Sequence, residues 1–363
     1  RIYLDYASTT PIDKRVIREM KGLWANPSSI HKEGILAKKK LEKARKRVAR
    51  IMKIKTEEVI FTSGGTGSVN LAILGVVRNF ENPHIITSTI EHSAVLETCK
   101  YLEKNNLAEV SYASVDGEGL VSPKEIESLI KENTVLISIM YVNNEIGTIQ
   151  PISEISKIIP RNVYFHTDAS QAPNYLDIHM ERLGVDMMAI DGSKVYGPRG
   201  IGVLAVKKDV KMSPILFGGG QEKGLRPGTE NLPAICGLAK ALEISNIERK
   251  KESERLLKIR DWFVDELKGN FPDCKINGSL KKRIPNNVNI CFPKIDSEFL
   301  VIRLDQLGFA TSFASSCQSD YSYVVSKVSG EECGKSSLRI SFGRDTNKRK
   351  LKRFIGVLKK ILV

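Results

Sequence analysis

Residues 163–206, VYFHTDASQAPNYLDIHMERLGVDMMAIDGSKVYGPRGIGVLAV, decide the fold of this chain. They contain three apolar, β-branched runs at Val163–Asp168, Met187–Asp191 and Gly200–Val206. Runs that stay apolar on consecutive residues are typical of strands covered on both faces. The stretch therefore predicts adjacent buried strands, each followed by polar or small residues.

The same pattern extends toward the N-terminus, at Val59–Ser63, His84–Ser88 and Thr134–Val142. Helix-period segments lie between these runs. The apolar stripe of one such helix, beneath many Lys and Arg, consists of Leu41, Ala44, Val48, Ile51 and Met52. Alternation of short apolar runs with amphipathic helices predicts an α/β domain around a largely parallel sheet.

The pattern changes near residue 245. A charged helix over 246–267 is followed by strand candidates at Asn287–Phe292 and Ser337–Gly343, and then by an amphipathic helix near the end. This order indicates a smaller α+β domain. The length of 363 residues agrees with about two domains.

Composition excludes several classes of protein. Hydrophobic residues make up 41% of the chain, too many for a disordered protein, and no apolar run approaches the roughly 20 residues that span a membrane. The six cysteines lack C-x-x-C spacing, which argues against a secreted disulfide framework or a zinc ribbon. We therefore expect a reduced, cytoplasmic protein without a resident metal.

The net charge is +14, from 56 Lys and Arg against 42 Asp and Glu. The basic residues concentrate in 38–55 and 344–360, where they cover apolar stripes, so solvated helix faces are the first interpretation. Such faces also suit an acidic protein partner. Nucleic acid is an unlikely direct ligand, because neither segment interleaves aromatic residues and no zinc-finger or RNP-type motif is present.

Polar residues follow each predicted strand, where open α/β sheets bind ligands. Gly64–Ser68, GGTGS, enters a helix and indicates an anion site, although such a turn is as often plain helix entry. His92 follows the next strand, and alone it resembles a core histidine. Asp168 and then Lys194 follow later strands.

Together these residues supply what pyridoxal 5'-phosphate (PLP) requires. A lysine forms the Schiff base, a carboxylate keeps the pyridine nitrogen protonated, and a helix N-terminus takes the phosphate. The alternative is that Lys194 is an ordinary surface lysine.

The ordered motifs resemble the NifS/IscS-like cysteine desulfurases, which are fold-type I, class-V aminotransferase-like PLP enzymes. The motifs run through almost the whole chain and are YLDYASTTP, NPSSIHKEG, FTSGGTGSVNLAI, EHSAVLETC, NNEIGTIQPI, HTDASQ, KVYGPRGIG, FGGGQEKGLRPGTENLP and SSLRISFGR. The resemblance implies a mainly parallel seven-stranded sheet between helices. We expect a large PLP-binding α/β domain over 12–245, and a small α+β domain made of 1–11 and 246–363.

The resemblance also implies residue roles. Lys194 would carry the cofactor, His92 would stack on its ring, and Asp168 would pair with its pyridine nitrogen. The other implied cofactor contacts are Gly65, Thr66, Asn144, Gln171, Asp191, Ser193 and, from a second subunit of a homodimer, Thr229.

For the substrate L-cysteine, the resemblance implies Asn144 and Arg339 as contacts, with Arg339 holding the carboxylate. Cys317, in a Ser-rich loop, would take the sulfur as a persulfide, release L-alanine and pass the sulfur to iron–sulfur cluster assembly or to tRNA or cofactor thiolation. It would also be a possible transient iron–sulfur ligand. An iron–sulfur scaffold or other sulfur-acceptor protein is the expected partner.

The chain departs from the family at Asp191 and Ser193, where Ser-x-His-Lys is usual. A carboxylate aimed at a phosphate dianion would repel it. We therefore expect Asp191 to turn away or to bond a neighbouring donor, with weaker cofactor binding as the result. The phosphate loop GGTGS replaces an Ala-Thr-Glu sequence, and the Cys317 loop is shorter than usual.

The other cysteines have no expected catalytic role. We expect buried structural thiols at Cys99, Cys236, Cys274 and Cys291, and either an inert Cys333 or its transient pairing with Cys317. Two further functions stay open: a selenocysteine lyase or other PLP β-eliminating enzyme, and a degenerate scaffold that binds acidic partners or RNA.

Overall fold

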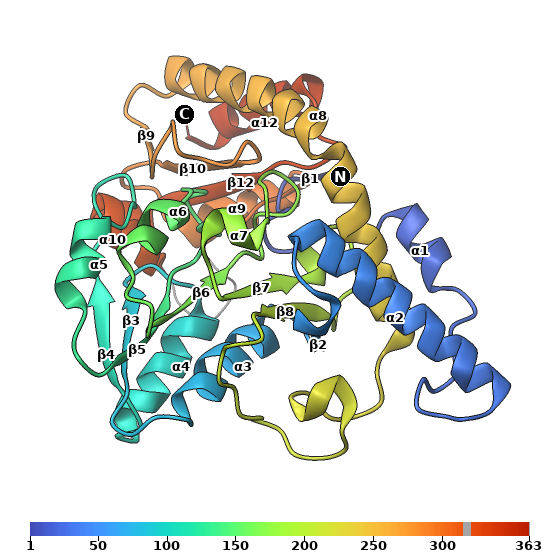
Figure 1. Ribbon diagram of the computed structural model, residues 1–363. Coiled ribbons are helices and arrows are strands. Elements are labelled where there is room, and N and C mark those ends of the chain that lie inside the picture. Colours follow the sequence, from blue (N-terminus) through green and yellow to red (C-terminus); the bar gives the residue numbers. More distant parts are fainter. Residues whose placement is uncertain (315–320, 363) are drawn as a thin grey trace.

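The computed structural model describes residues 1–314 and 321–362. Its centre is a seven-stranded sheet (Figure 1). In spatial order the strands are β2 (Val59–Thr62), β8 (Gly202–Val206), β7 (Met187–Asp191), β6 (Tyr164–Asp168), β5 (Thr134–Ser138), β3 (His84–Ser88) and β4 (Glu109–Ala113). The strand β8 runs opposite to the other six strands of this sheet, which share one direction, so the expected mainly parallel α/β sheet is confirmed.

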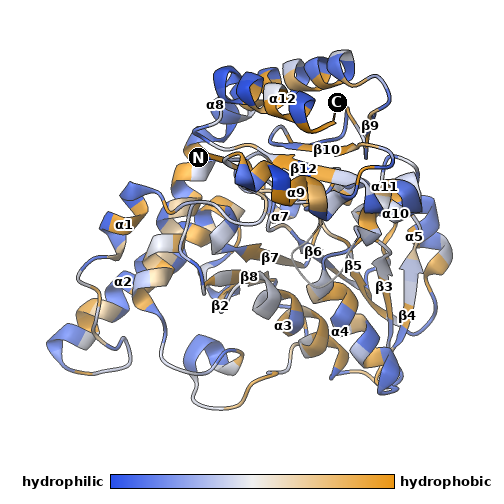
Figure 2. Cartoon of the chain, turned by 180° about the vertical axis from the view of Figure 1, so that it is seen from behind, coloured by the Kyte–Doolittle hydropathy of each residue, from blue (hydrophilic) through white to orange (hydrophobic). Residues whose placement is uncertain are grey.

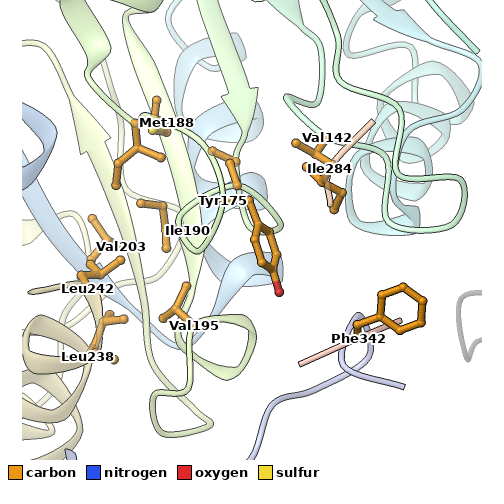
Figure 3. Close-up of a cluster of buried hydrophobic side chains, with 14 of the residues drawn as sticks. Val142, Tyr175, Met188, Ile190, Val195, Val203, Leu238, Leu242, Ile284 and Phe342 are labelled. Carbon is orange, nitrogen blue, oxygen red and sulfur yellow. The ribbon is translucent and has the colours of Figure 1, made fainter. Parts of the chain in front are cut away.

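Alternating residues of the strands bury two faces of the sheet. Ile60 and Leu204 contribute to the apolar cluster beneath α3 (Gly65–Val77) and α4 (Ser93–Lys104). Their neighbour Val203 faces the opposite cluster. Figure 3 shows Met188, Ile190 and Val203 of that second face near Leu238 and Leu242 of α8 (Leu232–Asn270). Burial on both faces explains the continuous apolar runs in the sequence.

Two details of the sheet differ from the sequence prediction. The strand β4 has no counterpart among the predicted strands, because it lies at the sheet edge and four of its five residues are at least partly exposed. The strand β5 ends at Ser138 rather than Val142. Beyond Ser138, the N–H groups of Ile139 and Tyr141 still donate to His166 and Asp168 of β6, and the chain then enters the loop that carries Asn144.

A second layer lies above the large sheet (Figure 1). It contains the antiparallel sheet β12 (Ser337–Ser341), β10 (Asn287–Cys291) and β9 (Lys275–Ile276), and the parallel pair β1 (Ile2–Tyr3) and β11 (Phe309–Ala310). The helix α8 runs unbroken from the large sheet to this layer, across the expected boundary at residue 245. We propose that α8 joins the two domains expected from the sequence.

The remaining helices cover the sheets and their connections. They are α1 (Lys14–Met20), α2 (Lys32–Met52), α5 (Pro123–Leu129), α6 (Ile152–Ile155), α7 (Met180–Leu183), α9 (Ser297–Gln306), α10 (Tyr323–Ser329), α11 (Glu331–Lys335) and α12 (Lys348–Leu362), with short 3-10 helices at 56–58, 156–158, 192–194 and 221–224. In residues 1–314 and 321–362, no helix combines the length and apolarity that a membrane span needs.

The two basic segments form the outer faces of α2 and α12. The helix α12 buries Leu351, Phe354, Ile355 and Leu358 and turns its Lys and Arg outward. In Figure 2 the ribbon of α12 alternates between hydrophilic and hydrophobic residues, as an amphipathic helix does. The expectation of amphipathic helices beneath the charge is therefore confirmed.

One cysteine prediction is wrong. Cys333 of α11, which we expected to be inert or to pair with Cys317, forms a disulfide with Cys291 at the end of β10, and Cys291 is buried as expected. The pairing arises because Phe292 N–H donates to Ser336 O, which brings α11 against the end of β10. Cys99 and Cys236 are buried free thiols as expected, whereas Cys274 is only partly buried.

Candidate active site

A cavity of about 210 Å³ lies where the carboxyl ends of β3, β5, β6 and β7 meet the N-terminus of α3. It brings together eight of the residues expected at the site from the sequence. Its lining consists of Gly65, Thr66, His92, Met140, Val142, Asn144, Asp168, Ser170, Gln171, Asp191 and Lys194.

Lys194 ends the 3-10 turn that follows β7, and its amine donates a hydrogen bond to the Ser8 carbonyl. Burial lowers the pKa of Lys194 below its ordinary value of 10.5, while the nearby Asp191 carboxylate opposes that shift. Burial favours the neutral form of an amine, and the neutral amine is the nucleophile. The position therefore suits covalent attachment of a carbonyl compound.

His92 is the N-cap of α4. Its Nδ1 accepts the Ala94 N–H at 3.1 Å, so the neutral ring carries its proton on Nε2. The hydrogen bond fixes the orientation of the ring at the wall of the cavity. His92 can therefore present a flat face to a bound ring and exchange a proton at Nε2.

Asp168 ends β6, and one of its carboxylate oxygens accepts the Ser170 N–H at 2.9 Å. Gln171 is anchored differently, because its side-chain amide donates to the Ala7 carbonyl at 2.9 Å. Behind Asp168, the buried His166 ring is hydrogen-bonded to Ser138, and burial lowers the pKa of His166 to about 4. A neutral His166 leaves the Asp168 carboxylate as the charge on this side of the cavity.

Glu91 lies directly before His92 and is completely buried. Ser88 O–H donates to its carboxyl group at 2.6 Å, and Met140 N–H donates to it at 3.0 Å. Burial raises the pKa of Glu91 to about 8. This carboxyl group ties the turn before α4 to the segment after β5, and sequence reasoning assigned it no role.

The Asp191 carboxylate accepts a hydrogen bond from a neighbouring donor, as expected. It has two donors, and one of them belongs to the glycine-rich segment Gly64–Ser68. Its Oδ1 accepts the Ser193 N–H at 2.6 Å, and its Oδ2 accepts the Gly65 N–H at 3.0 Å. Ser193 does not line the cavity. Its carbonyl accepts two hydrogen bonds from Thr10, both 2.8 Å long.

Arg339, in the middle of β12, does not line the cavity itself but contacts the lining residue Asn144. Its side chain is almost completely buried. Its guanidinium donates to the Asn144 carbonyl at 3.0 Å, to the Asp5 carboxylate at 3.0 Å and to the Ser8 hydroxyl at 2.6 Å. Sequence reasoning missed Asp5 and Ser8. The motif YLDYASTTP, which contains both residues, was the available signal.

Besides Ser193 and Arg339, two more expected site residues are not among the described residues that line this cavity. Thr229 is exposed on the segment after the 3-10 turn 221–224 and does not line it. Cys317 lies outside the described residues. The residues before and after the undescribed segment meet the site, since Ser312 pairs with Arg339 and the Ser322 hydroxyl donates to Glu145, the neighbour of Asn144.

The residues of the cavity fit PLP. Among the described residues, two buried polar atoms beside the cavity, Asn144 Oδ1 and Arg339 Nε, have no hydrogen-bond partner. Buried polar groups are normally paired, so a polar ligand is expected to complete them. Lys194, Asp168 and His92 provide the amine, carboxylate and ring that the cofactor requires. No cluster of three metal-ligating side chains occurs in the described part of the chain.

The chain has relatives in sequence that match it over nearly its whole length. It is 42% identical to the cysteine desulfurase IscS of Dictyoglomus turgidum, over 99% of this chain and 94% of that protein. It is 41% identical to cysteine desulfurase IscS of Methanosarcina thermophila, over 99% and 92%.

Solved structures agree with these relatives. A NifS-like protein superposes with a TM-score of 0.94 at 34% identity, over 100% of this chain and 99% of that chain. The structure of SspA in complex with cysteine superposes with a TM-score of 0.83 at 34% identity, over 94% and 99%. The family model described as "Aminotransferase class-V" matches residues 2–354, and the chain therefore belongs to that family.

Proposed function

We propose that the protein is a PLP-dependent cysteine desulfurase that converts L-cysteine to L-alanine and leaves the sulfur as a persulfide on Cys317. The observation that carries the proposal is the buried Lys194 amine, which shares one cavity with Asp168 and His92. The IscS relatives support the reaction, and the SspA complex supports L-cysteine as the substrate.

Enzymes of the class-V family use PLP, which when bound withdraws electrons from the substrate Cα. The Lys194 Nζ would hold the cofactor covalently through its carbonyl, and its amine would move protons at the substrate carbon. The Asp168 carboxylate holds a proton at the pyridine nitrogen. His92 orients the ring by stacking and exchanges a proton through Nε2, because its Nδ1 is held by Ala94.

The substrate carboxylate binds to Arg339, whose Nε has no partner among the described residues. A guanidinium suits this task because it binds a carboxylate in a fixed planar geometry. The sulfur then passes from the substrate to the Cys317 thiolate. In balance, L-cysteine and the Cys317 thiol become L-alanine and the Cys317 persulfide.

The test is turnover of L-cysteine by the PLP-loaded protein, with reductant, followed through both alanine and sulfide. Lys194→Ala should abolish both products and the absorbance band near ~420 nm. Cys317→Ala should abolish turnover of L-cysteine and keep the band, with Cys274→Ala, a partly buried thiol elsewhere, as the matched control. Selenocysteine turnover that survives Cys317→Ala, without turnover of L-cysteine by the wild type, would contradict the proposal.

We also propose a homodimer. Trp24, Ile30 and Phe217 are 80%, 94% and 81% exposed, which is unusual for large apolar side chains. A cavity of about 660 Å³ lies between the connector at residues 27–28, α2 and the segment 220–230. Thr229 belongs to that segment, and by resemblance it reaches the phosphate of the other subunit. A second copy would cover these groups.

Light scattering should give the mass of a dimer for the wild type. The double variant Ile30→Asp/Phe217→Asp should give a monomer, because two buried charges would oppose the interface. The double variant Ile247→Asp/Leu257→Asp, with exposed apolar residues of α8, is the matched control. A monomeric wild type would overturn the proposal.

The sulfur acceptor is proposed to be an acidic protein, such as an iron–sulfur scaffold, in the cytoplasm. The exposed cations of α2 and α12 support this choice, since charge complementarity accelerates association. Association should slow as salt rises, and an association rate that does not depend on salt would contradict an acidic partner.

A further inference from the structure

The Asp191 carboxylate joins β7 to the N-terminus of α3. One oxygen accepts the Ser193 N–H at 2.6 Å, and the other accepts the Gly65 N–H at 3.0 Å. Gly65 is the first residue of α3, a helix of 13 residues. The contact is close enough that a Cβ atom added to Gly65 would lie 3.2 Å from Asp191 Oδ2.

The amides at the N-terminus of α3 are also the donors that a phosphate would use. Free N–H groups and the helix dipole favour an anion at this place. Asp191 lines the same cavity as Gly65, Thr66 and Lys194, so its carboxylate is not turned away from the cofactor site. A phosphate that binds here must share donors with a carboxylate of like charge, which is unfavourable.

Two other groups lie near Asp191, the Ser170 hydroxyl and the Lys194 amine. The Ser170 hydroxyl is close to the same glycine, since the added Cβ would also lie 3.2 Å from Ser170 Oγ. A cation that interacts with Asp191 is Lys194, whose pKa Asp191 raises, and that amine is the group that would bind the cofactor covalently. The Asp191 carboxylate therefore occupies the anion position at the expense of the phosphate.

We propose that Asp191 is an internal substitute for the cofactor phosphate. It stabilises the cofactor-free chain by accepting the Gly65 and Ser193 amides, and it weakens the binding of PLP by competing for them. The proposal rests on the PLP site of the proposed function, and it does not depend on which reaction the bound cofactor serves.

The proposal predicts two effects of opposite sign. In Asp191→Asn and Asp191→Ser, the melting temperature of the cofactor-free protein should fall, because an anionic acceptor at the helix N-terminus is lost. The dissociation constant for PLP, from an absorbance titration, should decrease by about tenfold or more, because the like charge is gone. If Asp191 only held the cofactor site in shape, both substitutions would instead lower the melting temperature and also the affinity for PLP.

Pyridoxal, which lacks the phosphate, distinguishes competition at the phosphate from an effect on Lys194. Its dissociation constant should be nearly the same in the wild type and in both variants. An equal gain in affinity for pyridoxal and for PLP would overturn the proposal. Inorganic phosphate should raise the melting temperature of the variants and leave that of the wild type unchanged.

Asp186→Asn is the matched control. Asp186 precedes the opposite end of β7, where its carboxylate accepts the Phe165 N–H at 2.9 Å and pairs with Lys207. This substitution should lower the melting temperature without changing PLP affinity.

Unchanged or weaker PLP binding in Asp191→Ser and Asp191→Asn would overturn the proposal, and so would an unchanged melting temperature. Stabilisation of the wild type by inorganic phosphate would overturn it as well, and that measurement requires no variant. Absence of desulfurase activity, with the PLP and pyridoxal titrations as predicted, would instead contradict only the proposed function.

Discussion

Arg339 and Asp5 form an ion pair at the edge of the cavity, with 3.0 Å between Nη2 and Oδ1, and the Arg339 side chain is only 2% exposed. The pair joins the middle of β12 to the segment that follows β1, 334 residues apart in sequence. Asp5 thereby holds one edge of the guanidinium, while Nε has no partner in the described residues. The substrate carboxylate would bind a cation whose orientation is already fixed.

The first prediction concerns this pair. Asp5→Asn should raise the KM for L-cysteine by about tenfold or more, because a buried cation loses its partner and its fixed orientation. PLP affinity should stay unchanged, since Asp5 does not line the cavity. Steady-state kinetics and a PLP titration measure the two effects. Asp13→Asn is the control. Asp13 lies on the same N-terminal segment as Asp5 and forms an ion pair with Arg344, and its substitution should leave KM unchanged.

The second prediction concerns the pH dependence of cofactor capture. Burial lowers the pKa of Lys194, so the neutral amine is present at a lower pH than for an ordinary lysine. The rate at which the cofactor-free protein develops the band near ~420 nm should rise with pH and level off below pH 10.5. Stopped-flow absorbance measures this rate, and a midpoint at or above 10.5 would contradict the prediction.

The third prediction concerns Glu91 and stability. Its pKa is about 8 in the folded protein and 4.5 in an ordinary environment, so folding takes up a proton between those values. The group therefore makes the free energy of unfolding fall as pH rises from 4.5 to 8. In Glu91→Gln, which mimics the protonated group, this decline should be smaller by about 1 kcal/mol or more. Denaturant unfolding at pH 5 and pH 8 measures it, and equal declines would contradict the prediction.

The fourth prediction concerns the Cys291–Cys333 bond. It closes a sequence separation of 42 residues, for which a disulfide contributes about 2–4 kcal/mol. When protein prepared under oxidising conditions is treated with a reductant, the number of thiols that react in denaturant should rise by two. In the oxidised protein, Cys333→Ser should lower the free energy of unfolding by about 2–4 kcal/mol. Under reducing conditions Cys333→Ser should cost much less. Cys236→Ser, at a buried free thiol, should give the same loss under both conditions.

Much of the large sheet could be predicted from the sequence, because strands buried on both faces leave uninterrupted apolar runs. The strands β2, β3, β6, β7 and β8 all lie within their predicted ranges. The edge strand β4 could not be found in this way, since its exposed residues interrupt the run. Order along the chain also placed Lys194, Asp168 and His92 at one rim, because parallel strands align their carboxyl ends.

The contacts between distant segments could not be predicted. The Asp5–Arg339 pair and the Cys291–Cys333 bond depend on how the small sheets dock, which no local pattern encodes. The second acceptor contact of Asp191 has the same origin. The expectation covered a bond to some neighbouring donor, which the local bond to Ser193 fulfils, whereas the bond to Gly65 spans 126 residues.

The first ten residues have a consequence for how the protein is made. The Ser8 carbonyl accepts a hydrogen bond from Lys194, and the Thr10 hydroxyl donates one to Ser193. Asp5 forms the ion pair with Arg339, and the strand β1 pairs with β11. During synthesis these residues leave the ribosome well before β11 and β12, which lie about 300 residues further along the chain. The lysine side of the site can therefore form on the nascent chain, and the carboxylate-binding side forms only after Arg339 has emerged.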